Sequence, residues 1–179
     1  RITISFQSSF SDLTWKESPY GSFSDYVIMN PYDAPYDEYG RVNKTMSWEM
    51  ANPLFEAECG NYDEGANRSF TNSLSFRWDV LPGFFINGTG TIVTSRERTE
   101  KFISPESNVF KDVANRSEQG SLSVNNTRKL SYEGKFVVNY AKNLGEDYLL
   151  TLHGGFDISK KTQTMDGYTA YGFYKSNLH

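Results

Sequence analysis

The sequence is poor in the residues from which most catalytic and metal-binding sites are built. It has one cysteine, Cys59, and two histidines, His153 and His179. A single cysteine excludes an intrachain disulfide and a CxxC motif for a metal or for redox chemistry. Two histidines leave almost no material for a nucleophile, its base and the group that orients the base. We therefore expect no enzyme activity, no catalytic residue, no metal site and no cofactor.

Long hydrophobic runs and an excess of positive charge are absent as well. The chain has 18 basic and 22 acidic residues, a formal net charge of -4, so a phosphate backbone would meet no basic surface. We expect no nucleic-acid partner. The mean hydropathy is -0.59, and no apolar run approaches the roughly 18 residues that a membrane-spanning helix needs. This excludes a helical membrane protein but not a β-barrel, in which only alternate residues face lipid.

Aromatic residues are abundant, at 16% of the chain, and they recur with the period of a β-strand. Apolar residues alternate with polar ones in residues 2–10, 70–80, 130–140 and 148–158, a split that predicts strands with one apolar and one polar face. Pro82-Gly83 is a turn signal, after which residues 84–94 return as a strand. Residues 142–147 form a second short turn. The sequence therefore predicts β-hairpins.

The connections between these strands alternate between short and long. Polar stretches at about residues 30–67 and 100–126 exceed the 12 to 15 residues that connections in compact domains rarely pass. In residues 47–59 Pro53 is expected to interrupt any helix. Outer-membrane barrels combine short periplasmic turns with long extracellular loops and interfacial aromatic girdles. With Trp78, Tyr140 and Tyr148 near the short turns, we predict an all-β fold in which antiparallel hairpins form part of a large outer-membrane β-barrel with long extracellular loops.

Two sets of residues are candidates for contact with a ligand or partner. In a barrel, charges on strands belong on the face that lines the lumen, because an arginine or lysine at the lipid midplane costs about 2 to 4 kcal/mol. The lumen-facing candidates are Arg77, Asp79, Glu133, Lys135, His153 and Asp157. The second set, Tyr32, Tyr36 and Tyr39, lies in a Pro- and Asp-rich loop that could stack on sugars or contact a protein. The alternative is a rigid surface loop stabilised by its own aromatic contacts.

Short strings along the whole chain carry a family resemblance. They lie, in order, at residues 18–26, 29–32, 36–37, 52–57, 69–72, 102–105, 167–168 and 172–173. In this order and spacing the chain resembles the SusC/RagA family of TonB-linked outer-membrane proteins, typical of Bacteroidetes. Each string is short, so the resemblance depends on their shared order.

The resemblance implies a transporter of the bacterial outer membrane. It implies a 22-stranded barrel with a plugged lumen, embedded in outer-membrane lipid, energised through the TonB system and paired with a SusD-like surface lipoprotein. Such proteins import glycans or peptides as nutrients. Residues 1–179 would then be an internal part of the barrel, with the plug, the TonB box and the closing strands outside it. The alternative is a secreted, soluble β-sandwich that binds carbohydrate through its tyrosine-rich loop.

Overall fold

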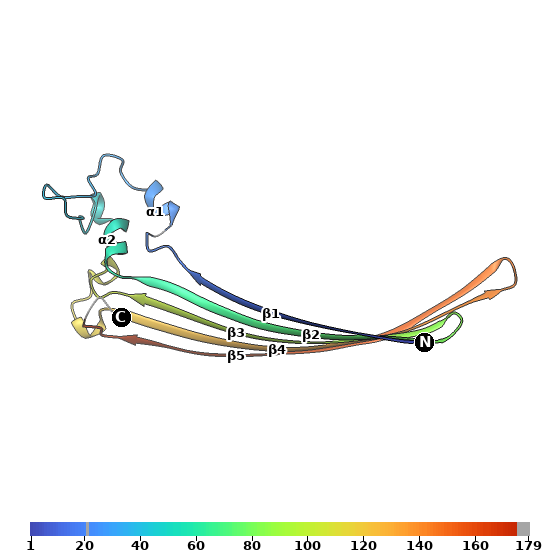
Figure 1. The fold of residues 1–179 in the computed structure, drawn as a ribbon. Helices are drawn as coiled ribbons and strands as arrows, with labels where there is room; N and C mark the ends of the chain where they lie inside the picture. Colours follow the sequence, from blue (N-terminus) through green and yellow to red (C-terminus); the bar gives the residue numbers. More distant parts are fainter. Residues whose placement is uncertain (21, 175–179) are drawn as a thin grey trace. The chain divides into compact units, whose positions relative to one another are not determined.

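The computed structural model describes residues 1–20 and 22–174, and the fold is all-β. The strands are β1 (Ile2–Lys16), β2 (Tyr62–Leu81), β3 (Phe84–Ile103), β4 (Ser121–Leu144) and β5 (Tyr148–Tyr171). They form one open, antiparallel, five-stranded sheet in the order β1-β2-β3-β4-β5 (Figure 1). Each strand therefore pairs with its neighbour along the chain, which confirms the predicted antiparallel hairpins.

The connections alternate between long and short as the sequence predicts, but the bounds of the two long ones differ from those expected. β2 begins at Tyr62, so the first long loop comprises residues 17–61. The second comprises only residues 104–120, because β3 continues to Ile103 and β4 begins at Ser121. The predicted turn at residues 142–147 also shrinks, since β4 continues through Leu144. Glycines with positive φ make both short turns, Gly83 at 77° and Gly145 at 81°.

The helices are short and lie in the two long loops. They are α1 (Phe23–Val27), η1 (Ser47–Glu49), α2 (Pro53–Glu58), η2 (Asn108–Phe110) and η3 (Arg116–Glu118). Within residues 1–20 and 22–174, no helix is long and apolar enough to cross a membrane.

Pro53 starts a helix, which corrects the expectation that it interrupts one. It occupies the first turn of α2, where a missing backbone N–H is no loss, and Asn52 caps the helix by accepting a hydrogen bond of 3.1 Å from the Leu54 amide.

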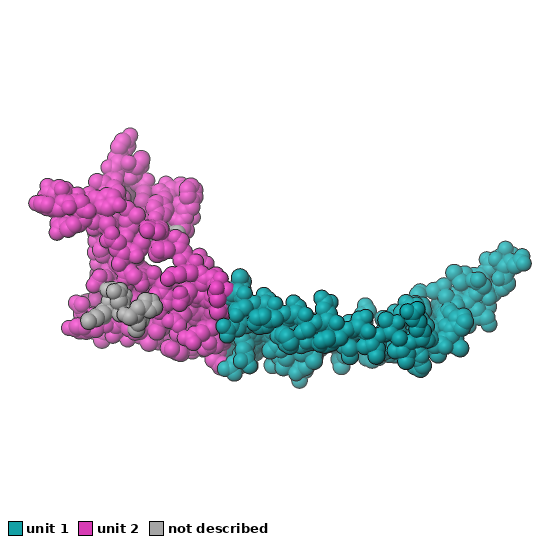
Figure 2. Space-filling model, viewed as in Figure 1, with its two compact units in different colours: residues 1–13, 67–97, 127–165 teal, residues 14–66, 98–126, 166–179 magenta. Residues whose placement is uncertain are grey.

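The chain divides into two compact units (Figure 2). Unit 1 comprises residues 1–13, 67–97 and 127–165, which are strand segments and the two short turns. Unit 2 comprises residues 14–66, 98–126 and 166–179, of which the structure describes all but residues 21 and 175–179; it holds the other strand segments and the long loops. His179 therefore lies outside the described residues.

The buried apolar core of the described chain lies entirely in unit 2. Its members are Cys59, Phe102 and Val124. The Phe102 ring, 1% exposed, stacks on Tyr62 with ring centroids 5.6 Å apart and meets Phe173 edge-on at 5.5 Å. No described residue of unit 1 belongs to this core, so the apolar side chains of unit 1 are only partly covered or exposed.

Candidate functional site

The strand segments of unit 1 have one apolar and one polar face. Rings from three strands meet on the apolar face, because Phe136 of β4 lies 6.4 Å from Phe76 of β2 and 5.8 Å from Phe156 of β5 between ring centroids. All three residue numbers are even. A side chain on Gly88 of β3 would overlap the Phe76 ring, so this glycine leaves room for an aromatic residue of the same face.

We call the apolar residues at even-numbered strand positions of unit 1, on β4 only as far as Tyr140, the apolar band. Its members are Ile2, Ile4, Phe6 and Phe10 of β1; Phe70, Leu74, Phe76, Trp78 and Val80 of β2; Phe84, Ile86 and Ile92 of β3; Leu130, Tyr132, Phe136, Val138 and Tyr140 of β4; and Tyr148, Leu150, Leu152, Phe156 and Ile158 of β5. Nothing else in unit 1 covers it, so Phe6 is 67% exposed and Phe156 64%. Soluble monomers rarely expose an apolar patch of this extent.

Apart from the Arg68–Asp12 ion pair, the polar side-chain contacts between the strands of unit 1 occur at odd-numbered positions. The Ser73 and Thr91 hydroxyls are 3.1 Å apart on β2 and β3, and the Ser95 hydroxyl donates to Asn67 at 2.9 Å. An ion pair of 3.8 Å between the Lys129 ammonium and the Glu97 carboxylate joins β4 to β3. The second face of unit 1 is therefore lined by hydrogen-bonding and charged groups.

The residues expected to face a lumen all occupy odd-numbered positions of this polar face. Arg77 forms an ion pair of 2.9 Å with Asp79 and lies 4.0 Å from the centre of the Phe85 ring. Between β4 and β5, Glu133 forms an ion pair of 3.9 Å with Lys161, and His153 Nδ1 lies 2.6 Å from Asn139 Oδ1. Lys135 and Asp157 lie on neighbouring strands, β4 and β5. These residues do not converge on one point, and that the face borders a lumen stays a prediction.

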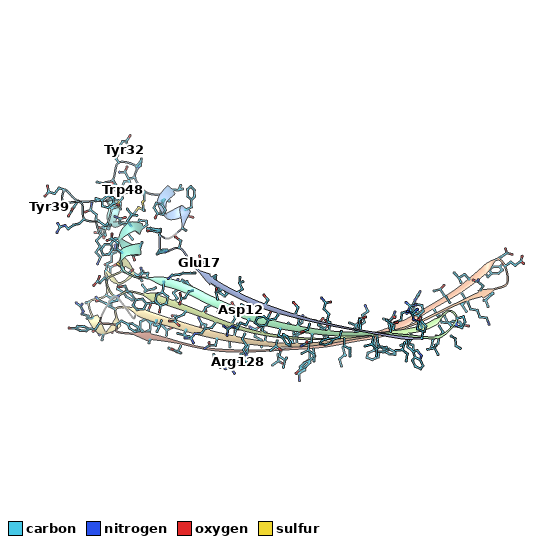
Figure 3. The ribbon with its side chains drawn as sticks, viewed as in Figure 1. Asp12, Glu17, Tyr32, Tyr39, Trp48 and Arg128 are labelled. Atoms are coloured by element: carbon cyan, nitrogen blue, oxygen red, sulfur yellow. The ribbon has the colours of Figure 1, made fainter. Side chains whose placement is uncertain are left out.

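The three loop tyrosines lie in the loop of residues 17–61 and are separately exposed. Tyr32 is 93% exposed, Tyr36 49% and Tyr39 74%. Figure 3 shows Tyr32 and Tyr39 projecting outward from the loop, in different directions. The structure therefore gives no single stacking platform made of all three rings.

A carboxylate organises the hairpin that carries Tyr39. Asp37 Oδ1 accepts hydrogen bonds from the backbone amides of Tyr39 and Arg41, each 2.8 Å long, and its Oδ2 pairs with the Arg41 guanidinium at 2.7 Å. The Arg41 guanidinium in turn lies 5.2 Å from the centre of the Tyr39 ring. These bonds, led by the one from the Arg41 amide, lower the pKa of Asp37.

Trp48 is a further exposed aromatic residue of this loop, and the sequence pattern does not predict it as a contact residue (Figure 3). Trp48 is 78% exposed and, like Glu49, adopts a positive φ, 57° and 56° respectively. Such a backbone costs about 1 to 2 kcal/mol per non-glycine residue. The turn is anchored by Ser47, whose amide and hydroxyl donate to the Asp33 carboxylate at 2.9 and 2.5 Å. No turn signal in the sequence announces it, because neither strained residue is Gly, Asn or Asp.

Glu56 of α2 ties the two long loops together. Its carboxylate accepts a hydrogen bond of 2.5 Å from the Ser107 hydroxyl and one of 2.8 Å from the Asn108 amide, both in residues 104–120. Asn61 donates to the same carboxylate at 3.0 Å, and its own Oδ1 accepts from the Ser104 amide at 2.8 Å. Charge-assisted hydrogen bonds of this kind are the stronger ones in proteins. The loops of unit 2 are thus held as one structure.

A cavity of about 600 Å³ lies beside this junction in unit 2. Its wall is mainly apolar, with Pro19, Ile28, Pro53 and Phe102 among the lining residues. The charged lining residues are Glu17, Glu56, Asp63 and Lys101. The volume lies in the range of small-molecule sites.

No protein-family model and no curated protein matches this chain. The resemblance to the SusC/RagA family therefore depends on the short strings of the sequence.

Proposed function

We propose that this chain is part of the wall of a TonB-dependent outer-membrane transporter of the SusC type, which imports glycans or peptides together with a SusD-like lipoprotein. The observation that carries the proposal is the apolar band, which runs across all five strands of unit 1 and is covered by no other element of that unit. In a barrel wall such a face meets lipid and the polar face meets the lumen.

The height of the apolar band suits a bilayer. On β2 it extends over residues 70–80, and a strand rises about 3.3 Å per residue. The stretch is therefore about 33 Å long, which at a tilt of about 40° spans about 25 Å, the height of the apolar band in outer-membrane barrels. Towards the short turns the band ends in aromatic residues, Trp78, Phe84, Tyr140 and Tyr148, as an interfacial girdle would.

The strands continue past the band in the direction of the long loops, and the first even-numbered positions after the band are polar. Arg68 and Glu64 follow Phe70 on β2 in this direction, and Lys160 follows Ile158 on β5. A strand that rises out of the bilayer into water would have this pattern. In the proposed transporter the long loops are extracellular, and Tyr32, Tyr39 and Trp48 are exposed there for contact with substrate or lipoprotein.

The second candidate is a secreted, soluble β-sandwich that binds carbohydrate through these loop aromatics. Their exposure favours it, since flat rings stack on sugars. A sandwich, however, needs a second sheet about 10 Å from the apolar face. All strands of the described chain belong to one sheet, which favours the barrel.

Quenching by brominated lipid tests the proposal. In the full-length protein carrying Cys59→Ser, a fluorophore is attached to Phe156→Cys on the apolar face or to Asp157→Cys on the polar face. Brominated acyl chains should quench the first label strongly and the second weakly, because only the first faces lipid. Recovery of the protein in the soluble fraction, with neither label quenched, would support the sandwich instead.

A further inference from the structure

Next to the apolar band, three adjacent strands of unit 1 each carry an arginine on the band's face. They are Arg68 of β2, Arg96 of β3 and Arg128 of β4. Arg68 follows Phe70 by two positions towards the long loops, and Arg128 stands in the same relation to Leu130. A spacing of two keeps each arginine on the face of the band and about 7 Å further along its strand.

The contacts between β2 and β3 bring the first two arginines opposite each other. The Ser73–Thr91 hydrogen bond and the close approach of the Phe76 ring to Gly88 fix the pairing on one side of Arg68. On the other side the Tyr62–Phe102 ring stack continues the same pairing. In this register Arg68 lies directly across from Arg96.

The contacts between β3 and β4 add the third arginine. The Ala141 amide donates to the Gly83 carbonyl at 2.7 Å, and the rings of Phe84 and Tyr140 meet with centroids 6.3 Å apart. The same register pairs Ile103, where β3 ends, with Ser121, where β4 begins. It sets Arg128 directly across from Arg96. The three arginines, here called the arginine row, thus lie side by side at one level.

The arginine row is only partly neutralised. Neighbouring strands are about 4.8 Å apart, so three guanidinium groups start from Cα atoms within about 10 Å, and like charges that face each other across strands are destabilising. Asp12 of β1 pairs with Arg68 at 3.1 Å, where the arginine side chain remains 69% exposed. Within residues 1–20 and 22–174, no ion pair involves Arg96 or Arg128. Figure 3 labels Asp12 and Arg128, which lie at the same stretch of the sheet.

We propose that the arginine row binds the phosphate groups of anionic lipid headgroups at the border of the apolar band. This inference rests on the proposed function, because the row lies where that function places the lipid–water interface. Guanidinium groups bind phosphate oxygens through paired, charge-assisted hydrogen bonds. Phe70 and Leu130, two positions from Arg68 and Arg128, hold the acyl chains against the same face, a contact that a free phosphate cannot make. An anionic headgroup also relieves the repulsion between Arg96 and Arg128.

The ratio of anionic to neutral lipid that the protein retains tests this proposal. The full-length protein, purified in a neutral detergent, is mixed with equal amounts of phosphatidylglycerol and phosphatidylcholine, and native mass spectrometry gives the ratio of the two lipids bound. The variant R68Q/R96Q/R128Q should lower the ratio at least about tenfold, since each basic residue near an anionic surface contributes about fivefold. Asp12→Asn should raise the ratio, because it releases Arg68 from its ion pair.

A matched variant removes three positive charges from odd-numbered strand positions. K101Q/K129Q/K161Q should leave the ratio unchanged, because these lysines lie on the other face and pair with Asp63, Glu97 and Glu133. An equal loss in both variants would mean that net charge alone attracts the lipid and would overturn the proposal. So would displacement of phosphatidylglycerol by inorganic phosphate, which would make the row a site for free phosphate.

The two proposals fail in different ways. If the wild-type protein resists extraction from membranes by alkaline carbonate but R68Q/R96Q/R128Q keeps the lipid ratio, only the arginine row is refuted. If the wild-type protein is released as a soluble protein, the transporter proposal fails first. Equal β-sheet circular dichroism of both triple variants establishes that each has folded.

Discussion

An arginine placed on the apolar band should cost far more stability than an arginine placed next to it. Leu152 lies near the middle of the apolar stretch 148–158 of β5 and is 55% exposed. In a bilayer this is close to the midplane, where an arginine on the lipid face costs about 2 to 4 kcal/mol. At 25 °C, Leu152→Arg should therefore lower the equilibrium constant between folded and unfolded protein by about 30- to 900-fold.

His153→Arg is the matched control, because the next residue of the strand points to the other face. It removes the contact between His153 and Asn139, a loss of about 1 kcal/mol, but leaves the new charge among polar groups. The assay is urea titration of the full-length protein folded into phosphatidylcholine vesicles, followed by tryptophan fluorescence. Equal losses of unfolding free energy, or a larger loss for His153→Arg, would refute the assignment of the two faces.

Three further predictions concern the loops of unit 2. Burial, followed by the negative charge of nearby Glu56, raises the pKa of the Cys59 thiol to about 12. At pH 8, iodoacetamide should therefore label Cys59 at least about 100-fold more slowly in the folded protein than in urea. Equal labelling rates would contradict the burial of this thiol. Glu56→Gln should destabilise the loop after β3 by about 1 to 3 kcal/mol, seen as faster amide hydrogen exchange there, whereas Glu58→Gln, exposed on the same helix, should not. The folded-state pKa of Asp37 is depressed, so the stability that this residue gives to the hairpin is present above the ordinary carboxyl pKa and is lost as pH falls through the depressed value. The amide resonances of Tyr39 and Arg41, which donate to Asp37, should therefore shift together at a pH below the ordinary carboxyl pKa. Shifts centred near pH 4 would contradict the lowered pKa.

The inner part of each strand is predictable from the sequence, whereas its extension towards the loops is not. Residues 70–80 alternate because one face is apolar, and the structure places them in β2 as expected. Just beyond the band both faces are polar, as in residues 96–101 of β3, which are all charged except Thr99. The period of two then disappears from the sequence. Strand and polar loop look alike there, which is why the sequence does not reveal the ends of β2, β3 and β4 beside the long loops.

The candidate site is predictable to a similar degree. The alternation of apolar and polar residues along the strands assigns Arg77 and His153 to the polar face, because successive side chains of a strand point to opposite faces of the sheet. The arginine row is invisible in the sequence, since its members lie far apart and meet only through the strand register. Trp48 is missed for another reason: its exposure depends on a strained backbone that contacts of Ser47 and Asp33 stabilise.

The alternation of short turns and long loops has a consequence for the order in which the sheet forms. Closing a short loop costs little entropy, so β2 with β3, and β4 with β5, should zip as hairpins within about 1 to 10 μs. Joining the hairpins along β3 and β4 requires ordering residues 104–120, and adding β1 requires ordering residues 17–61. The elementary step of assembly would then be a pair of strands, and the loop junction around Glu56 would form last.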